Sequence, residues 1–322
     1  MRIDVHAHQI DPLFYAELER LPGITVRDPG DGRRELRRGT TTYMWSRQEW
    51  FSDEHCLSDM DAKRIDVRIL SLSAPNVHAF EAARQPALAR AFNDGLLARC
   101  GRVPDRLRAL CCLPIADVEQ ALVELDRVRT HGQFAGIAMG SNIGGLPLNH
   151  ASLEPLWSRL NALRIPVVEH PMYPENTVGL DEYELPIRVG FMYETTTALT
   201  RMIYGGVFER YPDFPYVVAH TGAALLVLLD RLDNGYRIFP DCRRDITRLP
   251  STFVRDLYFD TCAFSEHALR LACAVVGPGR LLFGTDYPYI DADAAHVERL
   301  ELSPPDQSAV LGGNAARLFG IR

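Results

Sequence analysis

Eight short apolar runs, rich in valine, isoleucine and leucine, recur along the 322-residue chain and limit its fold more than any other feature. They lie at residues 2–5, 67–72, 107–113, 135–139, 165–169, 216–219, 257–261 and 281–284. Most of them are continuously apolar rather than alternating, which is typical of parallel strands covered on both faces. We therefore expect eight buried parallel strands.

Amphipathic segments with helical spacing separate these runs. In residues 118–128 apolar side chains recur every three or four positions, and Asp117 is placed to act as the N-cap. Ser152 precedes a similar segment, and further helices are expected at 223–232, 266–276 and 306–319, the last ended by Gly320. Eight alternating strands and helices predict an α/β fold in which a parallel sheet closes into a (β/α)8 TIM barrel.

Two connections are too long for simple crossovers. Pro29-Gly30-Asp31-Gly32 is a strong turn signal between polar stretches, so we expect a small β-hairpin insertion after the first strand, at about residues 20–45, over the barrel mouth. The loop at 171–186 is a candidate wall of an active site. No repeat or linker divides the chain, which predicts a single domain over residues 1–322.

Composition excludes several classes of function. Lys+Arg total 35 and Asp+Glu total 42, a formal net charge of −7, which disfavours nucleic acid and anionic membrane surfaces as partners. The longest purely apolar run, 223–229, is far shorter than the ~20 residues that cross a bilayer. The first residues carry an acid and a histidine rather than a signal peptide, so we expect a cytoplasmic protein. The seven cysteines show no C-x-x-C spacing, which favours buried, reduced thiols and excludes a four-cysteine metal site.

Histidines and one aspartate follow several of the predicted strands. His6 and His8 can face the same side of an extended chain, and His170, His220 and Asp286 each follow an apolar run. All five lie at the carboxyl ends of strands, where barrel enzymes form their active sites. Imidazole and carboxylate ligands suit a single divalent ion such as Zn²⁺, with Mn²⁺ as an alternative, and leave positions open for water or substrate.

Together these residues resemble the amidohydrolase superfamily, and within it the amidohydrolase-2 group typified by 2-amino-3-carboxymuconate-6-semialdehyde decarboxylase and related aromatic-acid decarboxylases. The resemblance covers essentially the whole chain. It is carried by Ile3-Asp4-Val5-His6-Ala7-His8, Asp59-Met60-Asp61-Ala62, Glu169-His170-Pro171, Tyr193-Glu194-Thr195-Thr196, Gly205-Gly206-Val207-Phe208-Glu209, Ala219-His220-Thr221-Gly222, Gly284-Thr285-Asp286-Tyr287-Pro288 and Gly313-Asn314-Ala315-Ala316-Arg317-Leu318-Phe319.

The resemblance implies four metal ligands, His6, His8, His170 and Asp286, with His220 as the catalytic acid or base and Asp286 assisting it. An imidazole with a pKa near 6.5 suits a group that moves protons at neutral pH. The structural alternatives are a fifth ligand or a core histidine for His220, a structural histidine for His170 and a helix N-cap for Asp286. The resemblance also implies a homodimer and no organic cofactor.

Four further residues are candidates for substrate binding. Arg47 lies where the resembling decarboxylases place an arginine for a substrate carboxylate, which a guanidinium can bind in bidentate fashion. Tyr193, Phe264 and Tyr287 could wall an aromatic or dienoic substrate. A solvated arginine and ordinary aromatic packing are the structural alternatives.

Three functions remain open from the sequence. The first is non-oxidative decarboxylation of a small aromatic or unsaturated carboxylic acid, which the resemblance favours. The second is metal-dependent hydrolysis of an amide, lactone or cyclic imide, for which the same ligands would serve. The third is a non-catalytic binding barrel, which would be expected to have lost ligands.

Overall fold

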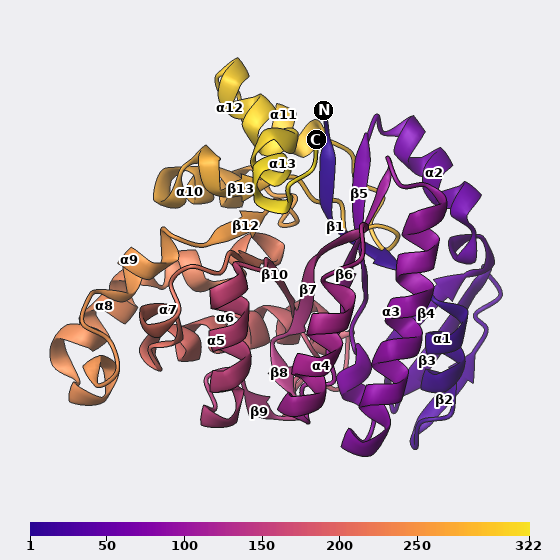
Figure 1. The fold of residues 1–322 in the computed structure, drawn as a ribbon, viewed down its shortest axis with the longest axis horizontal. Helices are drawn as coiled ribbons and strands as arrows, with labels where there is room; N and C mark the ends of the chain where they lie inside the picture. The colour runs from indigo at the N-terminus through magenta and orange to yellow at the C-terminus, as the bar shows by residue number, and fades with distance from the viewer.

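The computed structural model describes residues 1–322 as eight parallel strands with helices packed around them (Figure 1). In order around the sheet, the strands are β1 (Ile3–Gln9), β5 (Val67–Leu72), β6 (Leu107–Cys111), β7 (Phe134–Gly140), β10 (Val167–His170), β11 (Tyr216–Val218), β12 (Tyr258–Asp260) and β13 (Leu281–Leu282). Backbone hydrogen bonds from Val5 N to Phe283 O (2.9 Å) and from Asp286 N to His6 O (2.8 Å) join the first strand to the segment after the last. The predicted (β/α)8 barrel is thus confirmed, and each predicted apolar run overlaps one strand.

Helices surround the barrel in the predicted alternation. The longer ones are α2 (Asp53–Ala62), α3 (Gln85–Arg102), α4 (Val118–Val128), α5 (Glu154–Leu163), α6 (Phe191–Tyr204), α8 (Leu229–Ile238) and α10 (Glu266–Val276). The shorter ones are α1 (Pro12–Glu19), α7 (Val207–Arg210), α9 (Pro250–Val254), α11 (Ala295–Glu298), α12 (Pro304–Ser308) and α13 (Asn314–Phe319). Asp117 caps α4 by accepting from Gln120 N (3.1 Å), and Gly320 ends α13 with a left-handed φ of 64°, both as predicted.

The helix expected at 223–232 starts later than predicted. His220, Thr221 and Ala223 adopt left-handed backbone conformations, with φ of 51°, 54° and 54°, which are incompatible with a continuous α-helix. A short 3-10 turn at Leu225–Val227 follows, and the α-helix begins only at Leu229. The chain therefore bends sharply directly after β11, where His220 lies.

The insertion after β1 is larger than a hairpin. Strands β2 (Ile24–Arg27), β3 (Arg33–Arg38) and β4 (Thr41–Arg47) form a three-stranded antiparallel sheet. The predicted turn joins β2 to β3, and a second turn at residues 39–40, which the sequence analysis missed, adds the third strand. This small sheet lies beside α1 and α3 (Figure 1) and shares with them a buried apolar cluster that includes Phe14, Leu36 and Phe92.

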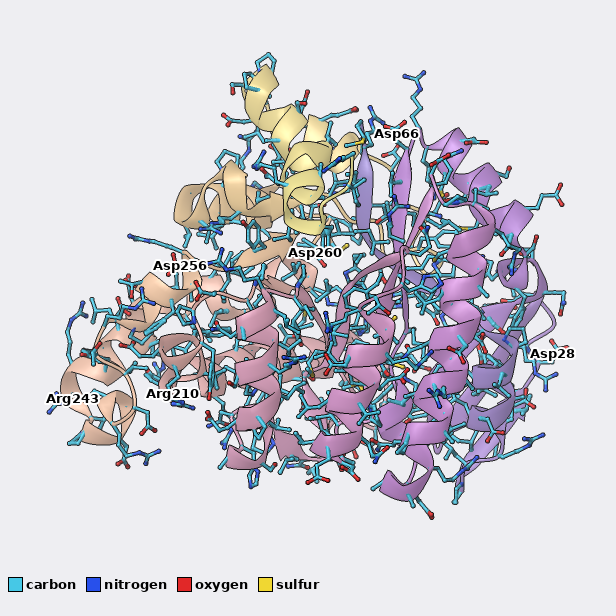
Figure 2. The ribbon with its side chains drawn as sticks, in the orientation of Figure 1. Asp28, Asp66, Arg210, Arg243, Asp256 and Asp260 are labelled. Carbon is cyan, nitrogen blue, oxygen red and sulfur yellow. The ribbon has the colours of Figure 1, made fainter.

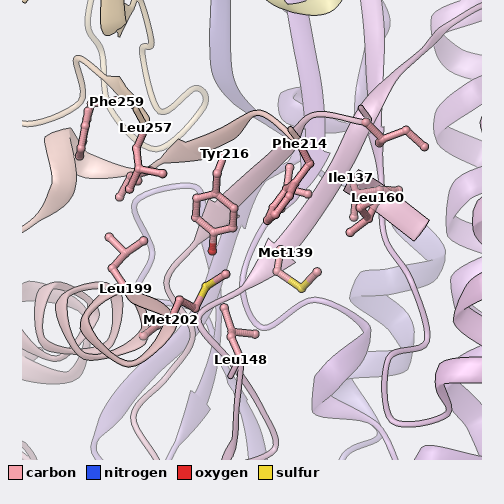
Figure 3. Close-up of a cluster of buried hydrophobic side chains, with 14 of the residues drawn as sticks. Ile137, Met139, Leu148, Leu160, Leu199, Met202, Phe214, Tyr216, Leu257 and Phe259 are labelled. Carbon is pink, nitrogen blue, oxygen red and sulfur yellow. The ribbon is translucent and has the colours of Figure 1, made fainter. Parts of the chain in front are cut away.

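Two apolar layers hold the barrel together. Inside it, side chains such as Val5, Val168 and Leu282 form one cluster, which Ala315 and Ile321 from the C-terminal region join. Outside it, strand and helix side chains pack as in Figure 3. The residues labelled there are Ile137, Met139, Leu148, Leu160, Leu199, Met202, Phe214, Tyr216, Leu257 and Phe259. Burial of each large apolar side chain contributes about 1.5–3 kcal/mol, so this layer fixes the strands that carry the site.

The remaining predictions about cysteines and membranes can be compared directly with the structure. All seven cysteines are free thiols, of which five are buried and Cys242 and Cys273 are half-buried. No helix combines the length and apolarity needed to cross a bilayer.

Candidate metal centre and active site

A β-bulge in the first strand turns two histidines into the barrel. Side chains alternate between the two faces of a strand, so Val5, which points into the barrel, and its neighbour His6 should face opposite ways. The pairing of β1 with β5 shifts register between Asp4 and Ala7, and this extra residue brings His6 and His8 inside as well. The sequence analysis placed the two histidines after the first strand. In the structure they lie within β1.

Four predicted residues come together at the carboxyl ends of the strands. His6 and His8 from β1, His170 from the end of β10 and Asp286 from the loop after β13 present ligand atoms that all lie within 4.8 Å of one another. Asp286 Oδ1 is 3.2 Å from His8 Nε2 and 3.5 Å from His6 Nε2. Three imidazoles and one carboxylate at this spacing could hold one divalent ion and leave a coordination position open.

The hydrogen bonds of the three histidines leave one nitrogen of each ring free. The Nδ1 atom of His6 contacts the Asp260 carboxylate. The Nδ1 atom of His8 contacts the Ser71 hydroxyl (3.1 Å), and the Nδ1 atom of His170 contacts the Pro171 carbonyl (2.9 Å). A carboxylate or carbonyl only accepts, and Ser71 Oγ itself donates to the Ala7 carbonyl (3.3 Å), so each Nδ1 carries the proton. The buried Nε2 atoms of His6 and His8 have no hydrogen-bond partner. Buried Nε2 atoms that face one point without a partner fit a metal ion, which on binding would displace the Nε2 proton that the raised pKa of His6 implies.

His220 lies beside the cluster but is not among the four residues whose ligand atoms converge. Its ring centroid is 5.2 Å from that of His6 and 5.6 Å from that of His170, and its Nδ1 is buried without a partner. Burial lowers the pKa of His220, and the nearby charge of His6 lowers it further. The imidazole therefore lies next to the candidate metal site, and no hydrogen bond holds its Nδ1.

Asp260, at the end of β12, is a site residue that the sequence analysis missed. Its Oδ2 is 2.5 Å from His6 Nδ1, and its Oδ1 accepts from the backbone amides of Thr221 (2.9 Å) and Cys262 (3.0 Å). Asp260 is buried and lies toward the middle of the molecule in Figure 2, whereas Asp28 and Arg243 lie at opposite edges. The available signal was an acid next to the end of the apolar run 257–261, since Asp260 ends β12 as His170 ends β10.

Buried charges in the centre shift one another's pKa values. Burial alone would lower the pKa of His6, but the Asp260 and Asp286 carboxylates outweigh it and raise that pKa to about 9. Burial alone would raise the pKa values of Asp260 and Asp286, but the neighbouring histidines hold both below the usual range for a carboxyl group. Both acids are therefore carboxylates at neutral pH. This is the form that Asp286 needs to bind a metal ion and that Asp260 needs to accept a hydrogen bond from His6.

A cavity of about 690 Å³ opens over this centre and is mostly apolar. Sixteen of its 22 lining residues are hydrophobic, and His170, His220 and Asp286 form part of its wall. Tyr43 and Trp45 of β4 also line it, so the insertion walls the barrel mouth as expected. The loop after β10 is tied to the insertion through hydrogen bonds from the Tyr173 hydroxyl to the Thr42 (3.1 Å) and Tyr43 carbonyls.

Only one of the four residues predicted to contact the substrate lines the cavity. Phe264 lines the cavity, whereas the other three are not among its lining residues. Arg47 donates to the Asp31 carbonyl (3.0 Å) within the insertion, and the side chain of Tyr193 is 62% exposed. Tyr287 is buried with the Arg68 guanidinium 4.0 Å above its ring. The arginine that does line the cavity is Arg188, which the sequence analysis missed.

Fold and site together define a (β/α)8 barrel with a candidate mononuclear metal centre at its carboxyl-terminal mouth. A family model described as amidohydrolase matches residues 3–321, so the chain belongs to the amidohydrolase family.

Individual relatives are decarboxylases. The chain is 28% identical over 272 residues to a 2-amino-3-carboxymuconate-6-semialdehyde decarboxylase of Dictyostelium discoideum, covering 82% of this chain and 76% of the relative. It is 29% identical over 281 residues to a gamma-resorcylate decarboxylase of Rhodococcus jostii, covering 81% and 85%. The crystal structure of a 2,6-dihydroxybenzoate decarboxylase from Rhizobium superposes with a TM-score of 0.83 at 25% identity, covering 99% of this chain and 98% of that one.

Proposed function

We propose that this protein is a metal-dependent, non-oxidative decarboxylase of a small aromatic or unsaturated carboxylic acid. The observation that carries the proposal is the set of three imidazoles and one carboxylate, with His220 beside it, at the floor of a largely apolar cavity. The decarboxylase relatives support the same reaction class. No redox cofactor is needed, because decarboxylation of such an acid has no net redox change, and we propose that no other organic cofactor takes part.

His6, His8, His170 and Asp286 would hold the ion, with Zn²⁺ as the first candidate and Mn²⁺ as the second. A bound divalent ion would supply a Lewis acid that orients and polarises substrate oxygens. Asp260, Ser71 and the Pro171 carbonyl keep the three imidazoles in the tautomer that ligation needs.

His220 is the residue that we assign to proton transfer. When the bond between the substrate carbon and its carboxylate breaks, the electron pair stays on that carbon, carbon dioxide leaves, and the carbon takes up one proton. His220 borders the cavity and contacts no carboxylate that would hold its proton. Asp286 assists by keeping negative charge beside the imidazole. The apolar wall keeps bulk water from competing at the new carbanionic carbon.

Metal analysis and a product assay together test the proposal. We expect about one divalent ion per chain and release of CO₂ from members of an aromatic-acid panel. Hydrolysis of an amide, lactone or cyclic imide panel without CO₂ release would contradict the proposal in favour of a hydrolase. Metal binding without turnover of either panel would contradict it in favour of a binding barrel.

A matched pair of histidine variants tests the role of His220. His220→Ala should keep its metal and lower CO₂ release by a factor of about 10²–10⁴, the usual contribution of a positioned acid or base. His267→Ala, which alters an exposed histidine on α10, should match the unaltered enzyme. Retained activity in His220→Ala would contradict the assignment.

We also propose that the enzyme works as a cytoplasmic homodimer. Large apolar side chains stay exposed on neighbouring elements, including Tyr193 of α6 at 62% and Val227 of the following 3-10 turn at 70%. Light scattering should give twice the chain mass, and a monomer at micromolar concentration would contradict this assembly.

A further inference from the structure

Arg188 stands out among the residues of the active-site cavity because it carries an unpaired charge. Of the 22 residues that line the cavity, it is the one lysine or arginine. Its guanidinium donates no hydrogen bond within the protein and has no carboxylate within 4.0 Å, whereas many other arginines of the chain are paired. An arginine without an internal partner, facing an apolar cavity, is suited to an anionic group of a ligand.

The position of Arg188 is fixed by the segment that carries it. Ile187, Arg188, Phe191 and Met192 all line the cavity, and this spacing is that of one helical face. The ring of Phe191 is 6.0 Å from that of His170. Arg188 therefore lies about one helical turn from Phe191, which contacts a candidate ligand. The Arg188 side chain is exposed, whereas His6 and His8 of the cluster are buried.

The segment before Arg188 is held in place by the insertion. Glu184 accepts from the backbone amide of Thr42 (2.8 Å) and from its hydroxyl (2.9 Å), and Arg188 N in turn donates to Glu184 O (3.0 Å). Such contacts position the arginine relative to the wall formed by β4. The backbone that carries Arg188 is thus held at the cavity wall, while its guanidinium has no partner within the protein.

The chemistry of decarboxylation indicates which anion Arg188 should bind. During the reaction negative charge leaves the departing carboxylate and moves onto carbon. An ion at the histidine cluster would already orient the departing carboxylate, and a further cation paired with the same group would stabilise the ground state more than the transition state. A cation paired with a second, unreactive anionic group supplies binding energy without this cost.

We propose that Arg188 binds a second carboxylate of the substrate, so that the preferred substrates are aromatic or unsaturated dicarboxylic acids. One carboxylate lies at the histidine cluster and departs, while the other pairs with Arg188 at the cavity wall. This inference rests on the proposed decarboxylase function for the identity of the first group, but the binding preference itself can be measured without turnover.

Binding to the metal-loaded protein tests the proposal, with Trp45 in the cavity wall as a fluorescent reporter. The two probes are benzoate and benzene-1,3-dicarboxylate. We expect the dicarboxylate to bind about tenfold more tightly, as one partly exposed charge-assisted pair would give. Arg188→Gln should abolish this preference and leave benzoate binding unchanged, and Arg188→Lys should retain part of it. Arg188 has no internal partner, so the variants should fold normally.

Two further variants make the test specific. Arg243→Gln, at the far edge of the molecule (Figure 2), should keep the full preference. Arg47→Gln, which alters the arginine favoured by sequence, should also keep it. An unchanged preference in Arg188→Gln, equal weakening of both probes, or loss of the preference in Arg47→Gln would overturn the proposal. A protein that shows the Arg188-dependent preference but releases no CO₂ would contradict the proposed function and not this inference.

Discussion

Replacing Asp260 with asparagine should remove His6 from the metal site while leaving the site's shape intact. The Oδ1 atom of Asp260 accepts two backbone amides, from Thr221 (2.9 Å) and Cys262 (3.0 Å), and these will hold the amide oxygen of an asparagine in the same place. The asparagine NH₂ must then face His6 Nδ1. Because NH₂ is a donor, Nδ1 must accept and the ring proton must move to Nε2. That proton occupies the lone pair directed at Asp286 and at the metal position.

The magnitude follows from this geometry. Loss of a residue that supports a metal ligand usually costs 10- to 100-fold in metal affinity, about 1.4–2.7 kcal/mol. Asp260→Asn should lower metal affinity by at least about 100-fold, because it removes the hydrogen-bond partner of His6 and also prevents His6 from acting as a ligand. The metal dissociation constant, measured by competition with a chromophoric chelator at pH 7, is the assay. Asp256→Asn, which alters an exposed acid just before β12, is the matched control. Affinity in Asp260→Asn within threefold of the control would refute the tautomer argument.

Two other substitutions test the buried charges. The pKa of His78 is lowered by burial to about 4, and neither ring nitrogen has a partner, so between pH 6.5 and 4 only the unfolded chain takes up the proton and stability falls as pH falls. His78→Gln should therefore reduce the loss of unfolding free energy between pH 7 and pH 5 by about 2 kcal/mol in urea titrations, and an unchanged loss would count against this reasoning. Arg68 is fully buried between Asp4 (2.9 Å) and Asp59 (2.7 Å), so Arg68→Met should cost about 3–5 kcal/mol. Arg106→Met, which breaks an exposed pair, should cost under about 1 kcal/mol, and equal costs for the two would contradict the prediction.

The barrel could be predicted because its signal is local and repeated. Each strand carries its own apolar run, and parallel strands of one barrel end at one rim, so residues that follow the runs must meet there. This reasoning was sufficient to bring His170 and Asp286 near each other across more than a hundred residues. Asp260 lies next to the end of the seventh run, but the sequence does not distinguish an acid in that place from an ordinary strand end.

Other features of the site depend on contacts that no single segment encodes. The bulge that turns His6 inward is a mismatch between β1 and β5, and it exists only when both strands are paired. The identity of the cavity arginine depends on how the insertion and the loop after β10 meet. Arg47 is bound to the Asp31 carbonyl within the insertion. Arg188 instead follows Glu184, which binds Thr42, and lines the cavity. Neither contact can be read from the local sequence.

The metal centre lies at the seam where the barrel closes. Backbone hydrogen bonds from Asp286 N to His6 O (2.8 Å) and from His8 N to Tyr287 O (2.7 Å) join the first strand to the segment after the last one. Asp4 strengthens the same seam, since its carboxylate accepts from Thr285 Oγ1 (2.7 Å) and from Arg68 (2.9 Å). Three of the four candidate ligands belong to this seam, so they reach their positions only when the whole sheet has formed. An ion bound there would therefore stabilise the closed barrel, because its ligands come from both sides of the seam. The backbone hydrogen bonds that close the barrel also set the geometry of the site.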